Sequence, residues 1–227
     1  MPHLEILIED RSGAKLLEGL LEPVLSERPL PWTWALRPHR GIGRLPRDWR
    51  QRPAPLAAGL LDLLPAKLRV YERQAARRPD FILLIVLDAD REPPEERFRE
   101  LQTLVHHCTE RLSSVVAIAV EEMEAWILGD PEALLAAWPH ADRRLLASYE
   151  QDSVCGTWEL LARAILGSTA ERLIRVGYPA VGAMKGEWAE TVAPYLDPGR
   201  NRSPSFRRFY RSLLRRMDEL EAGIQSR

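Results

Sequence analysis

A run of seven apolar residues, Phe81–Leu87, constrains the fold of this chain more than any other segment. Its short length and its β-branched residues predict a strand buried on both faces, as in a parallel sheet covered by helices. Asp88 and Asp90 follow the run directly. Ligands bind at the carboxyl edge of open α/β sheets, and two acids there repel each other unless a cation or a proton intervenes. The segment therefore predicts a Mg²⁺-type site at a strand end.

Strand and helix patterns alternate through the first two-thirds of the chain. Further strands are predicted over 3–9, 32–36 and 115–120, and helices over 16–25, 56–78 and 93–112, with Ser12 as an N-cap and a break near Pro65. Beyond about residue 140 only helices are expected. The predicted fold class is α/β, with a small, mainly parallel sheet flanked by helices and a helical C-terminal part. We expect a core over 1–140 and a helical extension over 141–227, packed together as one unit.

Composition sets limits on the function. A net charge of -1 excludes a strongly basic or acidic chain, and 227 residues suit one compact unit. Only three of the 32 basic residues are lysines, and arginine binds phosphate bidentately. The two cysteines lie far apart, which argues against a zinc site and a disulfide framework. With no signal peptide and no membrane-spanning apolar run, we expect a soluble cytoplasmic protein without a membrane partner.

Acidic residues follow three of the predicted strands. The set comprises Glu9, then Asp88 with Asp90, and then Glu122 with Glu124. The carboxyl ends of parallel strands share one edge, so these side chains can converge. Mg²⁺ prefers a few carboxylates, waters and substrate phosphates, and the bound ion can activate water for phosphoryl displacement.

Each acid also has a structural interpretation. Acids often follow strands as turn formers or N-caps, so Asp90 could simply cap the next helix. Glu122 and Glu124 face the same way only in extended backbone, since in a helix they diverge by about 200°. Glu121 is expected to be solvated, and Asp130 to cap a helix through the Asp-Pro pair.

Two arginine-rich stretches are candidates for phosphate contact. The first, over 37–52, includes Arg40 and Arg44; the second, over 200–216, includes Arg202, Arg207 and Arg208. Arginines bind phosphate backbones without reading sequence. The alternative is that both are solvated faces. Lys185 is either a phosphate contact or a surface residue.

Five segments carry a family resemblance: 6–9 (ILIE), 39–41 (HRG), 83–90 (LLIVLDAD), 119–130 (AVEEMEAWILGD) and 201–206 (NRSPSF). On these segments the chain resembles TOPRIM-like proteins of the domain-of-unknown-function family 4276, over nearly its full length. The resemblance implies that Glu9 is an acid/base or metal ligand and that Asp88 and Asp90 form the metal-binding DxD. Glu122 and Glu124 would complete the site. Asp10 stands where such proteins usually have glycine, and the second acid of an EGxxE pattern is missing.

The resulting prediction is a Mg²⁺- or Mn²⁺-dependent nuclease acting on DNA or RNA. The resemblance further implies an AAA/ABC-type ATPase partner, encoded nearby in antiphage defence modules. One alternative is a phosphatase or phosphotransferase with an aspartyl nucleophile, although Arg91 and Glu92 follow the DxD without the expected threonine. The other is a non-catalytic module that binds an ATPase or nucleic acid. The substrate, the number of metals and the oligomeric state stay open.

Overall fold

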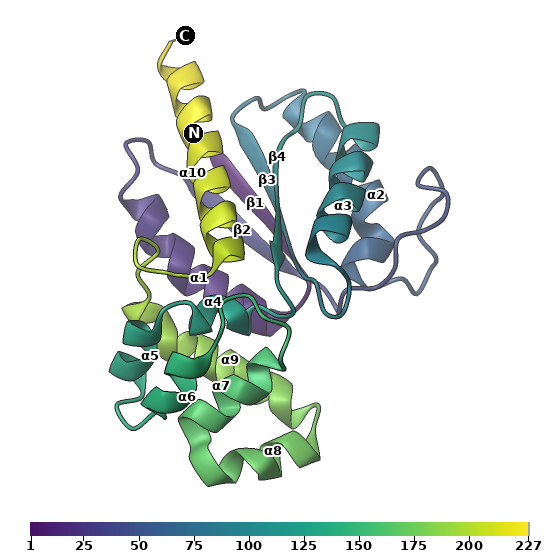
Figure 1. The fold of residues 1–227 in the computed structure, drawn as a ribbon. Helices are drawn as coiled ribbons and strands as arrows, with labels where there is room; N and C mark the ends of the chain where they lie inside the picture. The colour runs from purple at the N-terminus through teal and green to yellow at the C-terminus, as the bar shows by residue number, and fades with distance from the viewer. Residues whose placement is uncertain (227) are drawn as a thin grey trace.

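Four strands form a parallel sheet in the order β2–β1–β3–β4 in the computed structural model, which describes residues 1–226 (Figure 1). The strands are β1 (His3–Ile8), β2 (Thr33–Pro38), β3 (Phe81–Asp88) and β4 (Ser113–Ala119). The predicted strands are therefore confirmed, and every pairing is parallel. The residues of β3 from Phe81 to Leu87 are all buried, as the unbroken apolar run predicts.

Helices cover both faces of the sheet. They are α1 (Arg11–Ser26), α2 (Leu60–Ala75), α3 (Pro94–Cys108), α4 (Glu124–Leu128), α5 (Pro131–Ala137), α6 (Arg143–Ser148), α7 (Thr157–Leu166), α8 (Ala170–Val176), α9 (Ala180–Val192) and α10 (Pro204–Gln225), with 3-10 turns at Gly167–Thr169 and Ala193–Tyr195. One core cluster joins the sheet to α1 and α10, and the other joins it to α2 and α3. Figure 1 shows α4 to α9 gathered beyond the carboxyl ends of the strands.

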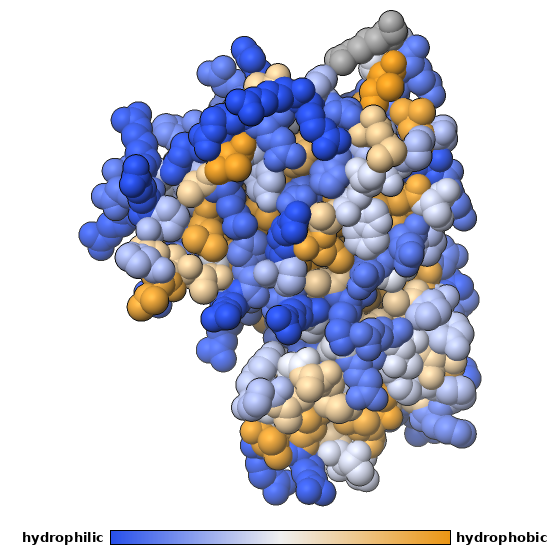
Figure 2. All heavy atoms as spheres, turned by 180° about the vertical axis from the view of Figure 1, so that it is seen from behind, coloured by the Kyte–Doolittle hydropathy of each residue, from blue (hydrophilic) through white to orange (hydrophobic). Residues whose placement is uncertain are grey.

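The helical C-terminal part is confirmed, and residues 141–226 contain no strand. Ser203 caps α10 by accepting a hydrogen bond from the Phe206 N–H at 3.1 Å, and Pro204 follows at the first helical position. α10 returns to pack against β4. Its Phe209 stacks on Trp126 of α4, with ring centroids 4.9 Å apart. Seen from behind, the surface is largely hydrophilic and is indented at its left edge (Figure 2).

Two local predictions are wrong. α2 runs through Pro65 without a break, because Leu61, Leu64 and Leu68 form a fully buried face that holds the helix on the sheet. The N-cap of α1 is Asp10 rather than Ser12: the Asp10 carboxylate accepts the Gly13 N–H and the Ser12 hydroxyl, each at 2.8 Å. Asp10 has a φ of -144°, so this turn requires no glycine.

No helix within residues 1–226 combines the length and the apolar character that crossing a membrane requires.

A buried glutamate ties the first two strands to α2 and gives a first stability prediction. The Glu5 carboxylate accepts hydrogen bonds from Arg37 Nε at 2.8 Å and the Tyr71 hydroxyl at 2.9 Å, and it lies 3.1 Å from His3 Nε2. Burial raises the pKa of Glu5, but these contacts with Arg37, His3 and Tyr71 outweigh it and leave the pKa below its usual range. Glu5→Gln should therefore cost about 1–3 kcal/mol of folding free energy at pH 7.

The pH dependence of Glu5→Gln follows from the lowered pKa. The stabilisation by Glu5 is present above the unfolded-state pKa and is lost as the pH falls through the folded-state pKa. The difference between variant and wild type in urea denaturation should thus shrink below about pH 4. Equal stability at pH 7 would contradict this role of Glu5.

Candidate functional site

The topology of the sheet creates a crevice between β1 and β3. β2 lies on one side of β1 and β3 on the other, so the connections leave the neighbouring strands in opposite directions. Ligand sites in open α/β sheets form at such a switch point, outside the carboxyl ends of the strands. Glu9 follows β1 and Asp88 ends β3 at this point. The sheet thus brings together the first two of the predicted acidic clusters.

The third acidic cluster lies at the same place, where Lys185 of α9 contacts both of its side chains. The Lys185 side chain is buried, and its Nζ lies 2.9 Å from Glu124 Oε2 and 3.5 Å from Glu122 Oε2. Glu122 stands in the turn after β4 and Glu124 is the first residue of α4. The two side chains therefore converge without extended backbone, contrary to our expectation. The interpretation of Lys185 as a surface residue is also wrong.

The carboxylate site, defined as Glu9, Asp88, Asp90, Glu122 and Glu124, holds more negative charge than Lys185 can balance. Burial, with the charges of Asp90 and Asp10, raises the pKa of Glu9 to about 7. Burial, reinforced by the charge of Glu124, raises the pKa of Glu122 to about 7. Burial and the charge of Glu9 hold the pKa of Asp88 well above its usual range.

Lys185 itself stays charged in this environment. Burial lowers its pKa, but the charges of Glu124, Glu122 and Asp88 outweigh burial and raise the pKa overall. One permanent cation is thus shared among several carboxylates, and the site retains an excess of acids that favours protons or a further cation.

Four carboxylate oxygens of the site are buried without a hydrogen-bond partner: Glu9 Oε2, Asp88 Oδ1, Glu122 Oε2 and Glu124 Oε2. The Lys185 contact to Glu124 is an ion pair that lacks hydrogen-bond geometry. Buried polar atoms nearly always have partners, so four such atoms in one site need an explanation. As hard oxygen donors they fit Mg²⁺. Within residues 1–226, however, no three His, Cys, Asp or Glu side chains are already arranged to hold a metal ion.

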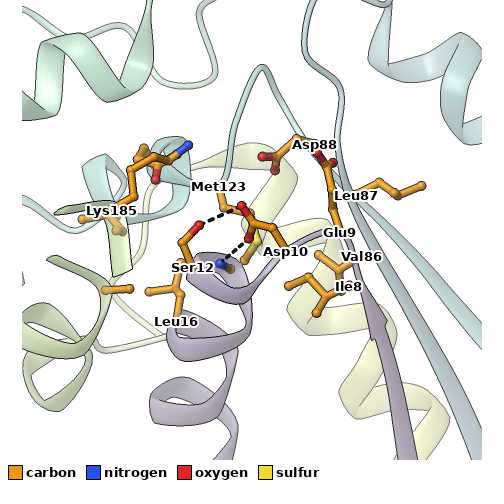
Figure 3. A pocket seen from close by; sticks show the side chains of 14 residues that line it. Ile8, Glu9, Asp10, Ser12, Leu16, Val86, Leu87, Asp88, Met123 and Lys185 are labelled. Carbon is orange, nitrogen blue, oxygen red and sulfur yellow. Dashed lines mark hydrogen bonds and ion pairs between the residues drawn. The ribbon is translucent and has the colours of Figure 1, made fainter. Parts of the chain in front are cut away.

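A small cavity of about 10 Å³ lies inside the carboxylate site (Figure 3). Glu9 and Asp88 line one side, and Lys185 extends toward them from the other. Met123 and Gly13 close it where α1 begins. A Cβ atom at Gly13 would lie 2.7 Å from the Met123 sulfur, so this glycine allows α1 to approach. The cavity has room for about one water-sized group.

A much larger cleft adjoins the carboxylate site, with a volume of about 730 Å³. Asp90 and Glu122 belong to both the site and this cleft, which we call the large cleft. Asp90 and Glu121 have left-handed backbone, with φ of 49° and 59°, and the Asp90 N–H donates to the Glu121 carbonyl at 2.8 Å. Strained non-glycine backbone of this kind is common at functional sites. Pro93, not Asp90, is the N-cap of α3, so the capping interpretation of Asp90 is wrong.

Glu121 is not the solvated residue that we expected. Its carboxylate accepts backbone N–H groups of Cys155, Gly156 and Thr157 at 2.9–3.1 Å, and so anchors the start of α7. A carboxylate there also complements the positive end of the helix. Glu121 thereby fixes the wall of the large cleft that α7 provides.

The predicted phosphate contacts divide into two groups. Arg44 lines the large cleft, and Arg40 is exposed on the same loop, whose Gly41 N–H donates to the Glu9 carbonyl at 3.1 Å. Arg207 and Arg208 are engaged by groups outside the carboxylate site.

Arg207 Nε donates to the Asn201 carbonyl at 2.6 Å, and Arg208 pairs with Glu95 at 2.6 Å. Arg202 is exposed. Within residues 1–226, none of these three arginines lines the small cavity or the large cleft. Only the first arginine-rich stretch therefore borders the carboxylate site.

The 201–206 segment (NRSPSF) holds α4 in place. Asn201 Nδ2 donates to the Trp126 carbonyl at 2.8 Å, and Trp126 Nε1 donates to the Ser205 hydroxyl at 2.9 Å. The Asp152 carboxylate accepts the Ser203 hydroxyl and the Ser205 N–H, each at 2.6 Å. These contacts fix the helix that carries Glu124 at its start.

Asp130 is a helix cap, as predicted, and accepts the Ala133 N–H at 3.1 Å. It also pairs with Arg200 Nε and Nη2 at 2.8 and 2.9 Å, so this arginine is structural too. The sequence interpretation missed Arg97 and Trp158, which line the large cleft. Each is one residue within an ordinary amphipathic helix, and no local pattern distinguishes it.

Comparison with known proteins gives one match. A family model described as "Domain of unknown function (DUF4276)" matches residues 8–214. No curated protein and no solved structure matches the chain.

Proposed function

The chain belongs to the DUF4276 family, and we propose that it is a Mg²⁺- or Mn²⁺-dependent TOPRIM-like nuclease that hydrolyses phosphodiester bonds in DNA or RNA. One observation carries the proposal: four buried carboxylate oxygens without a hydrogen-bond partner, only two of them ion-paired with Lys185, meet at the switch point of a parallel sheet. Burial and, after it, repulsion between the acids raise the pKa of Glu9 and Asp88. A hard divalent cation would satisfy these oxygens and relieve the repulsion.

Each residue of the site has a role in this proposal. Glu9, Asp88 and Asp90 would hold the ion, with Glu122 and Glu124 completing the set. A bound divalent cation supplies Lewis acidity and lowers the pKa of water. Lys185 keeps Glu122 and Glu124 close together, and its ammonium group lies at the small cavity, where it can neutralise a phosphate oxygen. Arg40 and Arg44 supply phosphate contacts from the loop beside Glu9.

A second candidate is a non-catalytic binding module. The ion pair of Lys185 with Glu124, at 2.9 Å, favours it, because a permanent ammonium group can serve as the counter-ion of the acids. Calorimetric titration with Mg²⁺ and Mn²⁺ separates the two candidates. The nuclease requires divalent binding that is lost in Asp88→Ala, whereas the module would bind neither ion.

The family resemblance adds a setting to the proposal: a cytoplasmic enzyme of an antiphage module that works with an ATPase encoded nearby. Co-expression with the neighbouring ATPase and purification through a tag on one partner tests the association. An ATPase that elutes without this chain would argue against the partnership. The nuclease proposal does not depend on this outcome, because the cleavage assay tests it separately.

Cleavage of nucleic acid tests the nuclease proposal. Purified protein with Mg²⁺ or Mn²⁺ should cut plasmid, single-stranded DNA or RNA, and EDTA should stop it. Asp88→Ala should lower the cleavage rate by about a hundredfold or more, because it removes an ion ligand. Glu18→Gln, an exposed acid on α1, is the matched control and should cleave normally. Equal cleavage by Asp88→Ala and wild type would reject the assignment.

A further inference from the structure

The large cleft offers a binding surface that the carboxylates alone do not explain. Its volume of about 730 Å³ is within the range of small-ligand sites. Apart from Asp90 and Glu122 of the carboxylate site, its lining includes Arg44, Arg91 and Arg97. It also includes Trp158 and three further acids, Glu92, Glu121 and Glu159. The cleft therefore places three arginines and one aromatic ring, among acidic side chains, directly beside the proposed reaction centre.

Arg97 of α3 lines this cleft, and its guanidinium is only partly engaged within the protein. Its Nη1 pairs with Glu100 at 2.8 Å, and its side chain is only 16% exposed. Its Nε is buried without a partner. A buried N–H normally has an acceptor, so the contacts of Arg97 within the protein leave part of its hydrogen-bonding capacity unused. The charge of Arg97 also lowers the pKa of Asp90, against the larger effect of burial, which places the guanidinium near the carboxylate site.

Trp158 of α7 provides the aromatic ring. Its side chain is half-buried, lines the large cleft and packs partly on the core. Within residues 1–226 it stacks on no other aromatic ring. The contacts of Glu121 with Gly156 and Thr157 fix the backbone beside it. A fixed, partly exposed indole is a stacking platform for a base.

We propose that the large cleft binds an unpaired nucleotide of a single-stranded nucleic acid, with its base on Trp158 and a phosphate on Arg97. Stacking on an indole requires a base that is free of its duplex neighbours. The phosphate would then lie next to Asp90. This inference gives the substrate class of the proposed nuclease. Only the cleavage of that substrate rests on the proposed nuclease function, because the binding itself needs no metal.

Binding in EDTA tests the inference separately from cleavage. Fluorescence anisotropy is measured with labelled single-stranded DNA, single-stranded RNA and duplex DNA of one sequence. Single strands should bind about tenfold tighter than duplex, and Trp158→Ala should remove about that factor. Arg97→Gln should reduce the slope of log K against log salt by about 0.7, the value for one lost phosphate contact on a single strand. Trp158→Phe should keep most of the affinity because it keeps a ring.

Matched controls guard against loss of folding. Tyr195→Ala removes an exposed aromatic ring outside the cleft, and Arg99→Gln removes an exposed arginine on the same helix as Arg97. Neither should change affinity. Equal affinity for single strands and duplex, or an unaltered affinity in Trp158→Ala, would overturn the inference even if the protein cleaves. Tight, Trp158-dependent binding without cleavage in Mg²⁺ or Mn²⁺ would instead uphold it and reject the nuclease.

Discussion

Replacing Lys185 with methionine should cost the protein about 3–5 kcal/mol of folding free energy, measured by urea denaturation in EDTA. The Lys185 side chain is only 6% exposed and lies against two carboxylates. Methionine has a similar length and no charge, so the change removes the cation and keeps most of the volume. Glu122, Glu124 and Asp88 would then remain buried without a counter-ion, which is among the most costly changes in a protein interior.

Two further variants show whether charge is the cause. In Lys185→Met/Glu124→Gln the second change removes one of the uncompensated acids, so the double variant should recover part of the lost stability. Lys15→Met is the matched control: Lys15 pairs with Glu190 at 2.7 Å, but the two side chains are 40% and 59% exposed. It should cost less than about 1 kcal/mol. A Lys185→Met variant as stable as Lys15→Met would contradict the role of Lys185 as counter-ion.

The convergence of Glu9 and Asp88 could be predicted from sequence because it depends on topology alone. The apolar runs at 6–8 and 81–87 identify buried strands, and parallel strands end at one edge. Any acid directly after such a strand must lie near that edge. The same argument does not explain the positions of Glu122 and Glu124, although both reach the site. β4 ends at Ala119, and the turn and short helix that follow depend on Asn201, which is distant in sequence.

The partners of the acids had no signal in the sequence. Lys185 is buried because its helix, α9, packs on α1 next to the carboxylate site. Nothing in its neighbourhood distinguishes it from an exposed lysine on a helix. The second arginine-rich stretch, over 200–216, was misleading for a related reason. A guanidinium group binds a backbone carbonyl or a carboxylate as well as it binds phosphate, and Arg207 and Arg200 are used in this way.

Asp88→Asn should make the protein more stable and should remove most of the stability that the protein gains from Mg²⁺. Asp88 Oδ1 is buried without a donor, and burial and the charges of Glu9, Glu124 and Glu122 oppose its ionisation more than the charge of Lys185 favours it. A neutral amide of the same shape removes this repulsion and should add about 1–2 kcal/mol at pH 7 in EDTA. Functional sites often keep residues that lower stability, because the ligand requires them. Wild type should in turn gain stability from Mg²⁺ by mass action, and Asp88→Asn should gain little.

Asp80→Asn is the control for the direction of this change in stability. Asp80 lies at the other end of β3 and pairs with the N-terminal amine at 3.1 Å and with Arg78 at 3.5 Å. Burial raises the pKa of Asp80, but these partners lower it overall, so neutralising this acid should cost stability rather than add it. Thermal melts of both variants, with and without Mg²⁺, compare a partnered acid with an unpartnered one. If Asp88→Asn destabilises the protein as Asp80→Asn does, Asp88 has a structural role and the proposed metal site is rejected.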